Sequence, residues 1–274
     1  MAFLVLSDIH SNLEALVSVL EDAEGDYDHI LCLGDLVGYG ADPNPIVDWA
    51  RGKSTIGLLA QAPITEVIRG NHDRACCGLD DLENFNPAAR AAAMWTRKQL
   101  LTVNRTYLEE LTPGPLSIRY EGDAADPDSD PEDRVFDLVH GSPVDEDQYV
   151  SRLVDAVTLL DELDRQLTFF GHTHLQGGFL LTPDTAQRIP VAAPGPEATG
   201  RLAIEIESDC FYLINPGSVG QPRDKDPRAA YAIYTAETKT VEYRRVQYDI
   251  DKAAKKIRAA GLPEGLAARL YQGT

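Results

Sequence analysis

Histidines, aspartates or an asparagine follow short apolar segments at five places in this chain. The five stretches are FLVLSDIH, ILCLGD, EVIRGNHD, FDLVHG and LTFFGHTH, and in each of them the polar residues come directly after the apolar run. Short apolar runs rich in β-branched and aromatic residues predict buried strands. Because ligands of layered α/β proteins bind beyond the carboxyl ends of the strands, the five clusters are expected to meet at one site.

The remaining pattern predicts strands and helices that alternate in the first half and strands that dominate from about residue 175 to 247. Predicted buried strands cover residues 3–6, 30–33, 66–68, 135–139, 167–170, 212–214 and 230–234. Predicted helices cover residues 11–24 with a cap at Ser11 or Asn12, 86–113 with a break near 102–104, 146–163, and 250–272 split at 261–263. The pattern favours layered α/β, with a mixed sheet or two sheets packed face to face between helices.

Composition excludes several classes of protein. The net charge of −19 disfavours binding to duplex nucleic acid or to anionic membranes, but it does not exclude a small phosphorylated ligand. No apolar run is long enough to span a membrane, and the N-terminus lacks the basic start of a signal peptide. The four cysteines show no disulfide or metal-site spacing, so we expect reduced thiols and a cytoplasmic protein. The acidic segment 121–133 predicts a solvated loop.

The donor types in the clusters predict a metal site. Any one of these short motifs could be structural, but five of them, each after an apolar strand, favour a shared function. Five of the six histidines lie in the clusters, and the exception, His29, precedes a strand and is expected to be structural. Oxygen and nitrogen donors without thiolate suit two borderline divalent ions such as manganese, iron, nickel, cobalt or zinc. A carboxylate can bridge two cations about 3.5–4 Å apart, which is the arrangement used for displacement at phosphorus.

In their order, the motifs DIH, GD, GNHD, H and GHTH resemble those of the calcineurin-like metallophosphoesterase superfamily. They cover residues 8–174, and NPGSVGQPRD at 215–224 extends the resemblance to the small prokaryotic phosphodiesterase branch. The resemblance implies a four-layer αββα sandwich, in which two mixed sheets pack face to face between helices. We expect one such domain over 1–250, with a helical cap-like insert at about 75–113 and a helical tail over 251–274 packed on it.

The resemblance also implies roles for individual residues. The implied ligands are Asp8, His10 and His174 for the first ion, Asn71, His140 and His172 for the second, and Asp35 as the bridge. A hydroxide shared by the two ions would attack phosphorus in line with the leaving group, and His72 would be the candidate acid. Ser218 lacks the spacing of a nucleophile and is expected in a tight turn, with Arg223 as a possible phosphate contact.

One departure from the family motifs reduces the range of candidate substrates. Branches that act on phosphoproteins or dinucleoside tetraphosphates carry an acidic or amide residue and then an arginine, where this chain has Gly38 and Tyr39 in GDLVGYG. This argues against a protein phosphatase and leaves His72 without the partner that would orient it. Tyr39 could stack on a ring of the substrate or pack in the core, and Asn84, Phe85 and Asn86 of the insert could reach the site.

The sequence thus predicts a metallophosphoesterase that hydrolyses phosphodiesters or nucleotide-like small molecules. The alternatives are a phosphomonoesterase or dinucleoside polyphosphate hydrolase on the same site, and a metal-free scaffold of the same fold. The scaffold is disfavoured because every ligand position is filled. A DNA nuclease is disfavoured by the acidity of the chain and the lack of a basic patch.

Overall fold

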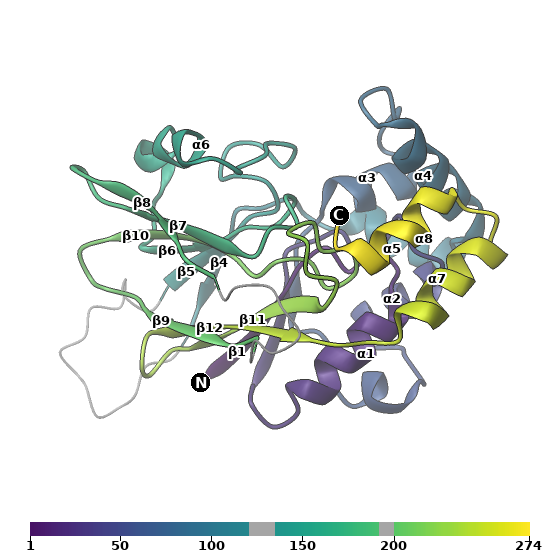
Figure 1. Ribbon diagram of the computed structural model, residues 1–274, viewed down its shortest axis with the longest axis horizontal. Helices are drawn as coiled ribbons and strands as arrows, with labels where there is room; N and C mark the ends of the chain where they lie inside the picture. The colour runs from purple at the N-terminus through teal and green to yellow at the C-terminus, as the bar shows by residue number, and fades with distance from the viewer. Residues whose placement is uncertain (121–134, 192–199) are drawn as a thin grey trace.

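Two six-stranded mixed sheets lie face to face in the computed structural model, which describes residues 1–120, 135–191 and 200–274 (Figure 1). The acidic segment 121–133 lies outside the described residues. In spatial order the first sheet contains β3 (Glu66–Val67), β2 (His29–Cys32), β1 (Ala2–Leu6), β11 (Ala229–Thr235), β12 (Thr240–Val246) and β9 (Leu202–Glu205). The second contains β4 (Leu116–Arg119), β5 (Val135–Leu138), β6 (Leu167–Phe169), β10 (Phe211–Asn215), β7 (Gly177–Leu181) and β8 (Ala186–Ile189). Strands lie at all seven predicted places, but β3 has only two residues and neither is buried, so the prediction of a buried strand there is wrong.

The strands that carry the polar clusters are parallel within each sheet. In the first sheet β1 pairs with β2 and β2 pairs with β3, all in parallel register. In the second sheet β5 and β6 are parallel neighbours. Parallel neighbours end on the same edge of a sheet, so the residues that follow β1, β2 and β3 emerge together, as do those that follow β5 and β6.

Strand β1 shows how the core is divided. Phe3 and Val5 belong to the cluster between the two sheets, whereas Leu4 and Leu6 belong to the cluster on the helix-covered face. Successive side chains of a strand point to opposite faces, so a central strand covered on both sides must be apolar at every position. This explains why the run AFLVL does not alternate with polar residues.

Helices cover the outer faces of the sandwich. They are α1 (Leu13–Asp22), α2 (Pro43–Ala50), α3 (Asn71–Cys77), α4 (Pro87–Gln99), α5 (Thr102–Glu110), α6 (Leu153–Val157), α7 (Ile250–Ala259) and α8 (Glu264–Gln272), with short 3₁₀ turns at Gly57–Ala60 and Leu160–Glu162. Helix α1 contacts β11 and β12 of the first sheet, and α6 contacts β7 and β8 of the second. The side chain of Asn12 caps α1 by accepting from the Ala15 amide. None of the helices in the described ranges has the length and apolarity to cross a membrane.

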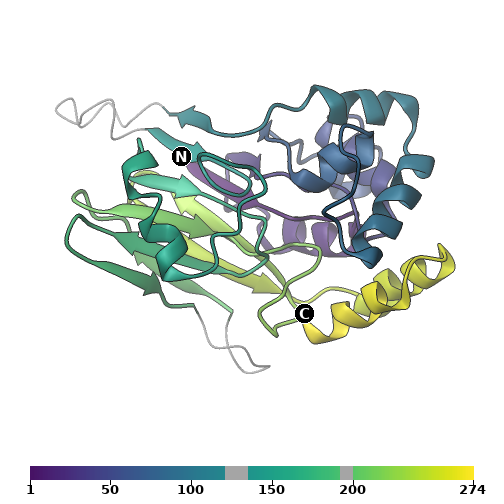
Figure 2. The same cartoon turned by 90° about the horizontal axis from the view of Figure 1, so that it is seen from above.

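The C-terminal helices α7 and α8 lie at the same end of the sandwich as the insert helices α4 and α5 (Figure 2). They share one apolar cluster with Tyr39 and with Ala89 and Ala92 of α4, to which Leu266 of α8 contributes a fully buried side chain. The predicted split of this segment is confirmed. The insert is also broken as predicted, although α5 already begins at Thr102.

The helix predicted over 146–163 is largely wrong, because only α6 (Leu153–Val157) is α-helical and the 3₁₀ turn Leu160–Glu162 follows it. Residues 146–152 instead run as a loop whose acidic side chains make long-range contacts. Glu146 pairs with Arg69 and Arg74, and Asp147 also pairs with Arg74. Ion pairs with residues from a different part of the chain thus override the local helical pattern. The four cysteines are buried and form no disulfide in the structure.

Candidate metal centre

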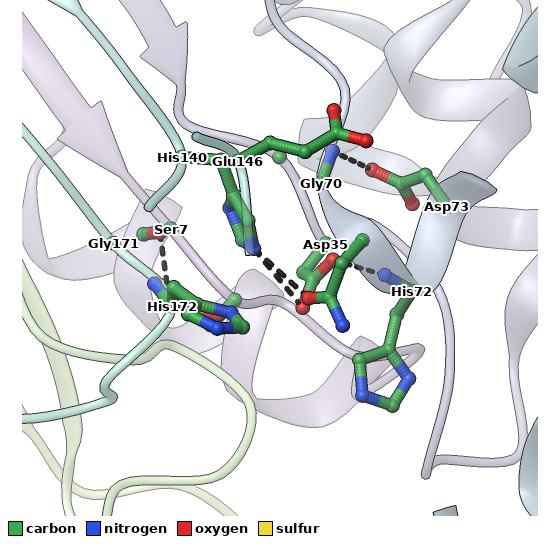
Figure 3. A network of polar contacts seen from close by, with 12 residues as sticks. Ser7, Asp35, Gly70, His72, Asp73, His140, Glu146, Gly171 and His172 are labelled. Carbon is green, nitrogen blue, oxygen red and sulfur yellow. Dashed lines mark hydrogen bonds and ion pairs between the residues drawn. The ribbon is translucent and has the colours of Figure 1, made fainter. Parts of the chain in front are cut away.

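The five clusters converge on one site where the two sheets end. Figure 3 shows Asp35 with His172 and His72 on opposite sides of it. Donor atoms of Asp8, His10, Asp35 and His174 lie within 4.8 Å of one another, and so do those of Asp35, His140 and His172. Asp35 belongs to both groups. The predicted ligands therefore meet in space, in two sets that share one carboxylate.

Backbone turns aim these side chains at the site. Asp8, His10, Asp35, His172 and His174 all have positive φ, between 49° and 63°. Residues other than glycine rarely adopt this left-handed conformation, which costs on the order of 1 kcal/mol or more and is concentrated at functional sites. Strands β1, β2 and β6 are thus each followed by a sharp turn that directs a polar side chain across the end of the sheet.

Each of the two aspartates has one oxygen hydrogen-bonded to the protein and one that faces histidine nitrogens, with Oδ1 of Asp8 3.2 Å from Nε2 of His174 and Oδ2 of Asp35 3.5 Å from Nε2 of His140. Oδ2 of Asp8 accepts from the Ser7 hydroxyl at 2.7 Å and from the His172 amide at 3.1 Å. Oδ1 of Asp35 accepts from the His72 amide at 2.8 Å. The other oxygen of each is buried and accepts no hydrogen bond within the described residues. A buried carboxylate oxygen without a donor is costly, so these two atoms require positive charge.

The histidines present lone pairs to the same space. Nδ1 of His10 lies 3.0 Å from the Val37 carbonyl, and Nδ1 of His174 lies 2.6 Å from the Gln221 carbonyl. A carbonyl only accepts, so Nδ1 carries the proton and Nε2 of each neutral ring is a lone-pair donor. The two Nε2 atoms face each other at 3.1 Å. Nitrogens bound at about 2.1 Å to one ion are separated by roughly this distance, so this pair fits a cation.

The second group is built in the same way. Nδ1 of His140 lies 2.7 Å from the Leu33 carbonyl, and its Nε2 lies 3.2 Å from Oδ1 of Asn71 and 3.5 Å from Oδ2 of Asp35. Nε2 of His172 lies 3.1 Å from the Asp147 carbonyl, which leaves Nδ1 as its lone-pair atom. Backbone carbonyls thus fix the ring orientation of all four histidines, as is usual for histidines that bind metals.

The pKa shifts follow from burial and from the carboxylates. Burial lowers the pKa of His10 well below its usual range and that of His172 to about 3, so both rings are neutral and able to bind a metal. Burial would also lower the pKa of His140, but the charge of Asp35 outweighs it and raises this pKa to about 10. Asp35 therefore favours positive charge beside it, which either a proton or a metal ion can supply.

His72 lies close to the cluster, but its ring is held by aromatic neighbours and not by a hydrogen bond to Nδ1. Its ring lies between those of Tyr39, at 4.4 Å between centroids, and Phe85, at 5.0 Å. Nδ1 is buried and has no hydrogen bond within the described residues. Burial lowers the pKa of His72 to about 4, so the metal-free protein holds a neutral ring here. The residue that precedes Asn71 is Gly70, where any Cβ would collide with the Asp35 carboxylate.

The segment 215–224 lies beside the site, as predicted. The Ser218 hydroxyl donates to the Asp8 carbonyl at 2.8 Å and accepts from the Gln221 amide, so it stabilises a turn. Arg223 donates to the hydroxyl of Tyr39 at 3.2 Å and to Oε1 of Gln221 at 3.4 Å. It forms no ion pair with a carboxylate of the described residues, although the chain is strongly acidic.

Sequence reasoning missed the carbonyls of Asp147 and Gln221 and the ring of Tyr149. The carbonyls orient His172 and His174, and no side-chain pattern identifies a backbone group in advance. Tyr149 lies with its ring centroid 4.0 Å from that of His172. Tyr149 was missed because it falls within the helix predicted over 146–163, which did not indicate that this segment lies at the site.

Comparisons with known proteins agree with this architecture. A family profile described as "Calcineurin-like phosphoesterase superfamily domain" matches residues 1–239. An uncharacterised protein of Methanocaldococcus jannaschii is 34% identical over 276 residues, covering 98% of this chain and 97% of its own. A metallophosphoesterase from Sphaerobacter thermophilus is similar in structure, with a TM-score of 0.75, 36% identity, and coverage of 100% of this chain and 99% of the other.

A hypothetical protein of Pyrococcus horikoshii shares the fold, with a TM-score of 0.73 at 19% identity, and the match covers 100% of this chain and 98% of that one. The predicted fold class of two mixed sheets flanked by helices is confirmed. The family uses divalent metals, and the His/Asp cluster described above could bind them. The chain therefore belongs to the calcineurin-like phosphoesterase superfamily and is a phosphoester hydrolase.

Proposed function

We propose that the protein is a dinuclear metal-dependent phosphodiesterase. The observation that carries this proposal is the pair of buried carboxylate oxygens without donors, on Asp8 and Asp35, that face histidine lone pairs. In this proposal the residues are assigned as the family motifs imply. The first ion is held by Asp8, His10 and His174, the second by Asn71, His140 and His172, and Asp35 bridges the two.

The bound ions would lower the pKa of a water molecule and draw charge from the phosphoryl oxygens. The chain's own residues would do the rest. The carbonyls that accept from the histidines keep the ligands oriented, and the Asp35 carboxylate keeps the two groups at a fixed spacing. His72 borders the space in front of the ligands, where it could hydrogen-bond to the departing oxygen.

The charge around the site supports a diester as the substrate. Arg223 lies near His72 and Tyr39 and has no carboxylate partner among the described residues, so it can contact a phosphoryl oxygen. A diester carries one negative charge, a monoester carries up to two, and dinucleoside polyphosphates carry more. The single positive charge of Arg223 matches the single negative charge of a diester better than the larger charge of the other two substrates. The Arg223→Gln variant is expected to raise KM for the diester about tenfold with unchanged metal content, and unchanged KM would contradict the contact.

The experiment that tests the proposed activity compares hydrolysis of bis(4-nitrophenyl) phosphate and 4-nitrophenyl phosphate across a panel of divalent metals. We expect the diester to be preferred, and a preference for the monoester would assign the site to a phosphomonoesterase. Asp35→Asn and His140→Ala should each lower kcat/KM by on the order of a hundredfold or more. His29→Ala, which removes the histidine outside the clusters, is the matched control and should retain activity. Full activity in both ligand variants would end the proposal.

A further inference from the structure

A pocket of about 310 Å³ opens beside the candidate metal centre. Asn71, His72 and His172 form its inner border, so any ester whose phosphate lies on the metals can extend into it. Its outer walls come from two segments that supply no ligands, namely the start of the insert and the loop after His140. None of the side chains in these outer walls is a proposed metal ligand, so the walls can select the substrate.

Besides the histidines, three aromatic residues line this pocket: Tyr39, and the two residues Phe85 and Tyr149 of the outer walls. Phe85 packs on the ring of His72 at 5.0 Å between centroids, and Tyr149 packs on the ring of His172 at 4.0 Å. His72 and His172 lie on opposite sides of Asp35 (Figure 3), and Phe85 and Tyr149 pack against these two different histidines. Tyr149 is 54% exposed, so its ring is accessible to a ligand in the pocket.

Among the described residues that line the pocket, no lysine or arginine is available for a second phosphate. Its arginine, Arg74, is paired with the carboxylates of Asp80, Glu146 and Asp147. Three acidic partners neutralise this guanidinium, so an added phosphate would meet excess negative charge here. A ligand group in this pocket is therefore expected to be uncharged.

The polar groups of the pocket that remain available are neutral amides. Asn86 accepts from the Ala88 and Ala89 amides with its oxygen, which leaves its NH₂ group free to donate. The side chain of Asn84 makes no hydrogen bond within the described residues, so it can both donate and accept. Amides of this kind recognise the mixed donor and acceptor edge of a heteroaromatic ring.

We propose that this pocket binds a flat heteroaromatic ring, of the nucleobase type, that belongs to the ester whose phosphate lies at the metal centre. Phe85 and Tyr149 contact the faces of the ring, and Asn84 and Asn86 contact its polar edge. The inference rests on the proposed function, and it names the substrate class as nucleoside phosphodiesters that carry no further phosphate on this side.

The test measures binding of two ligands of matched charge to the metal-loaded full chain. Calorimetry with adenosine 5′-monophosphate and with methyl phosphate separates the contribution of the ring from that of the phosphate. We expect the nucleotide to bind at least about tenfold more tightly, since stacking of one base on aromatic side chains contributes about 1–3 kcal/mol. Tyr149→Leu and Phe85→Leu should each remove most of this difference and leave the affinity for methyl phosphate unchanged.

Tyr271→Leu is the matched control, because Tyr271 is an exposed tyrosine of α8 outside the pocket, and it should bind both ligands as the wild type does. Equal affinity of the wild type for the two ligands would overturn the inference. So would a ring-dependent difference that survives in both leucine variants. Failure of the proposed function has a separate signature, namely no metal-dependent hydrolysis of bis(4-nitrophenyl) phosphate while ring-dependent binding persists.

Discussion

At the scale of single residues, Gly38 holds the position of an acidic or amide side chain in related branches and lies directly against His72. A Cβ placed on Gly38 would lie 2.5 Å from Nδ1 of His72. The missing side chain therefore explains both facts about this histidine: its Nδ1 has no hydrogen-bond partner, and its ring is held by Tyr39 and Phe85 instead. In this chain, aromatic packing replaces hydrogen bonding as the means of orienting His72.

The variant Gly38→Ala tests this account. The added methyl group must push the His72 ring out of its place, so we expect kcat to fall about tenfold or more while metal content stays unchanged. Gly25→Ala is the matched control, because Gly25 has a similar positive φ of 85° against 95° but has no atom near its Cβ position. Both variants should lose some stability through backbone strain. Equal activity of the two would contradict a positioned His72.

At the scale of secondary-structure elements, the C-terminal helices pack against Tyr39, which borders the site. Helices α7 and α8 share an apolar cluster with Tyr39, whose hydroxyl in turn accepts from Arg223. These helices lie beyond residue 239, where the family match ends. The proposed substrate contact of Arg223 would thus depend on packing supplied by a segment outside the matched domain.

Leu266→Ala measures this dependence. The side chain of Leu266 is fully buried in the shared cluster, so the free energy of unfolding should fall by about 2–5 kcal/mol. KM for the diester should rise as Tyr39 and Arg223 lose their support. Leu101→Ala, at a leucine that is 54% exposed, is the matched control and should change stability by less than about 0.5 kcal/mol. A destabilised Leu266→Ala protein with an unchanged KM would show that the helices do not support the site.

The strands and their polar ends could be predicted from the sequence because both signals are local. An apolar run such as FLVL followed by Asp8 and His10 is readable within eight residues. The helix over 146–163 was wrong because Arg69 and Arg74 hold Glu146 and Asp147 in a loop, and such ion pairs join distant segments. The same loop brings Tyr149 to His172, so this residue of the pocket could not be predicted, whereas Phe85 was named from its position in the insert.

At the scale of the whole molecule, the parallel strands of the two sheets place many hydrogen-bond acceptors at one site and few positively charged side chains. The chain carries 44 acidic and 25 basic residues, and at the centre of the site the donor atoms of Asp8, Asp35 and four histidines meet without a lysine or arginine between them in the described part of the chain. The folded state therefore concentrates carboxylates and nitrogen lone pairs at one site, and bound metal ions can neutralise the resulting negative charge. Binding of those ions should also stabilise the folded state.

The most direct test of the central claim is the number of divalent ions per folded chain, measured by elemental mass spectrometry after reconstitution and removal of free metal. The account predicts about two ions per chain in the wild type and fewer in Asp35→Asn, because this carboxylate serves both groups of ligands. A folded wild-type chain that retains no stoichiometric divalent ion would contradict it.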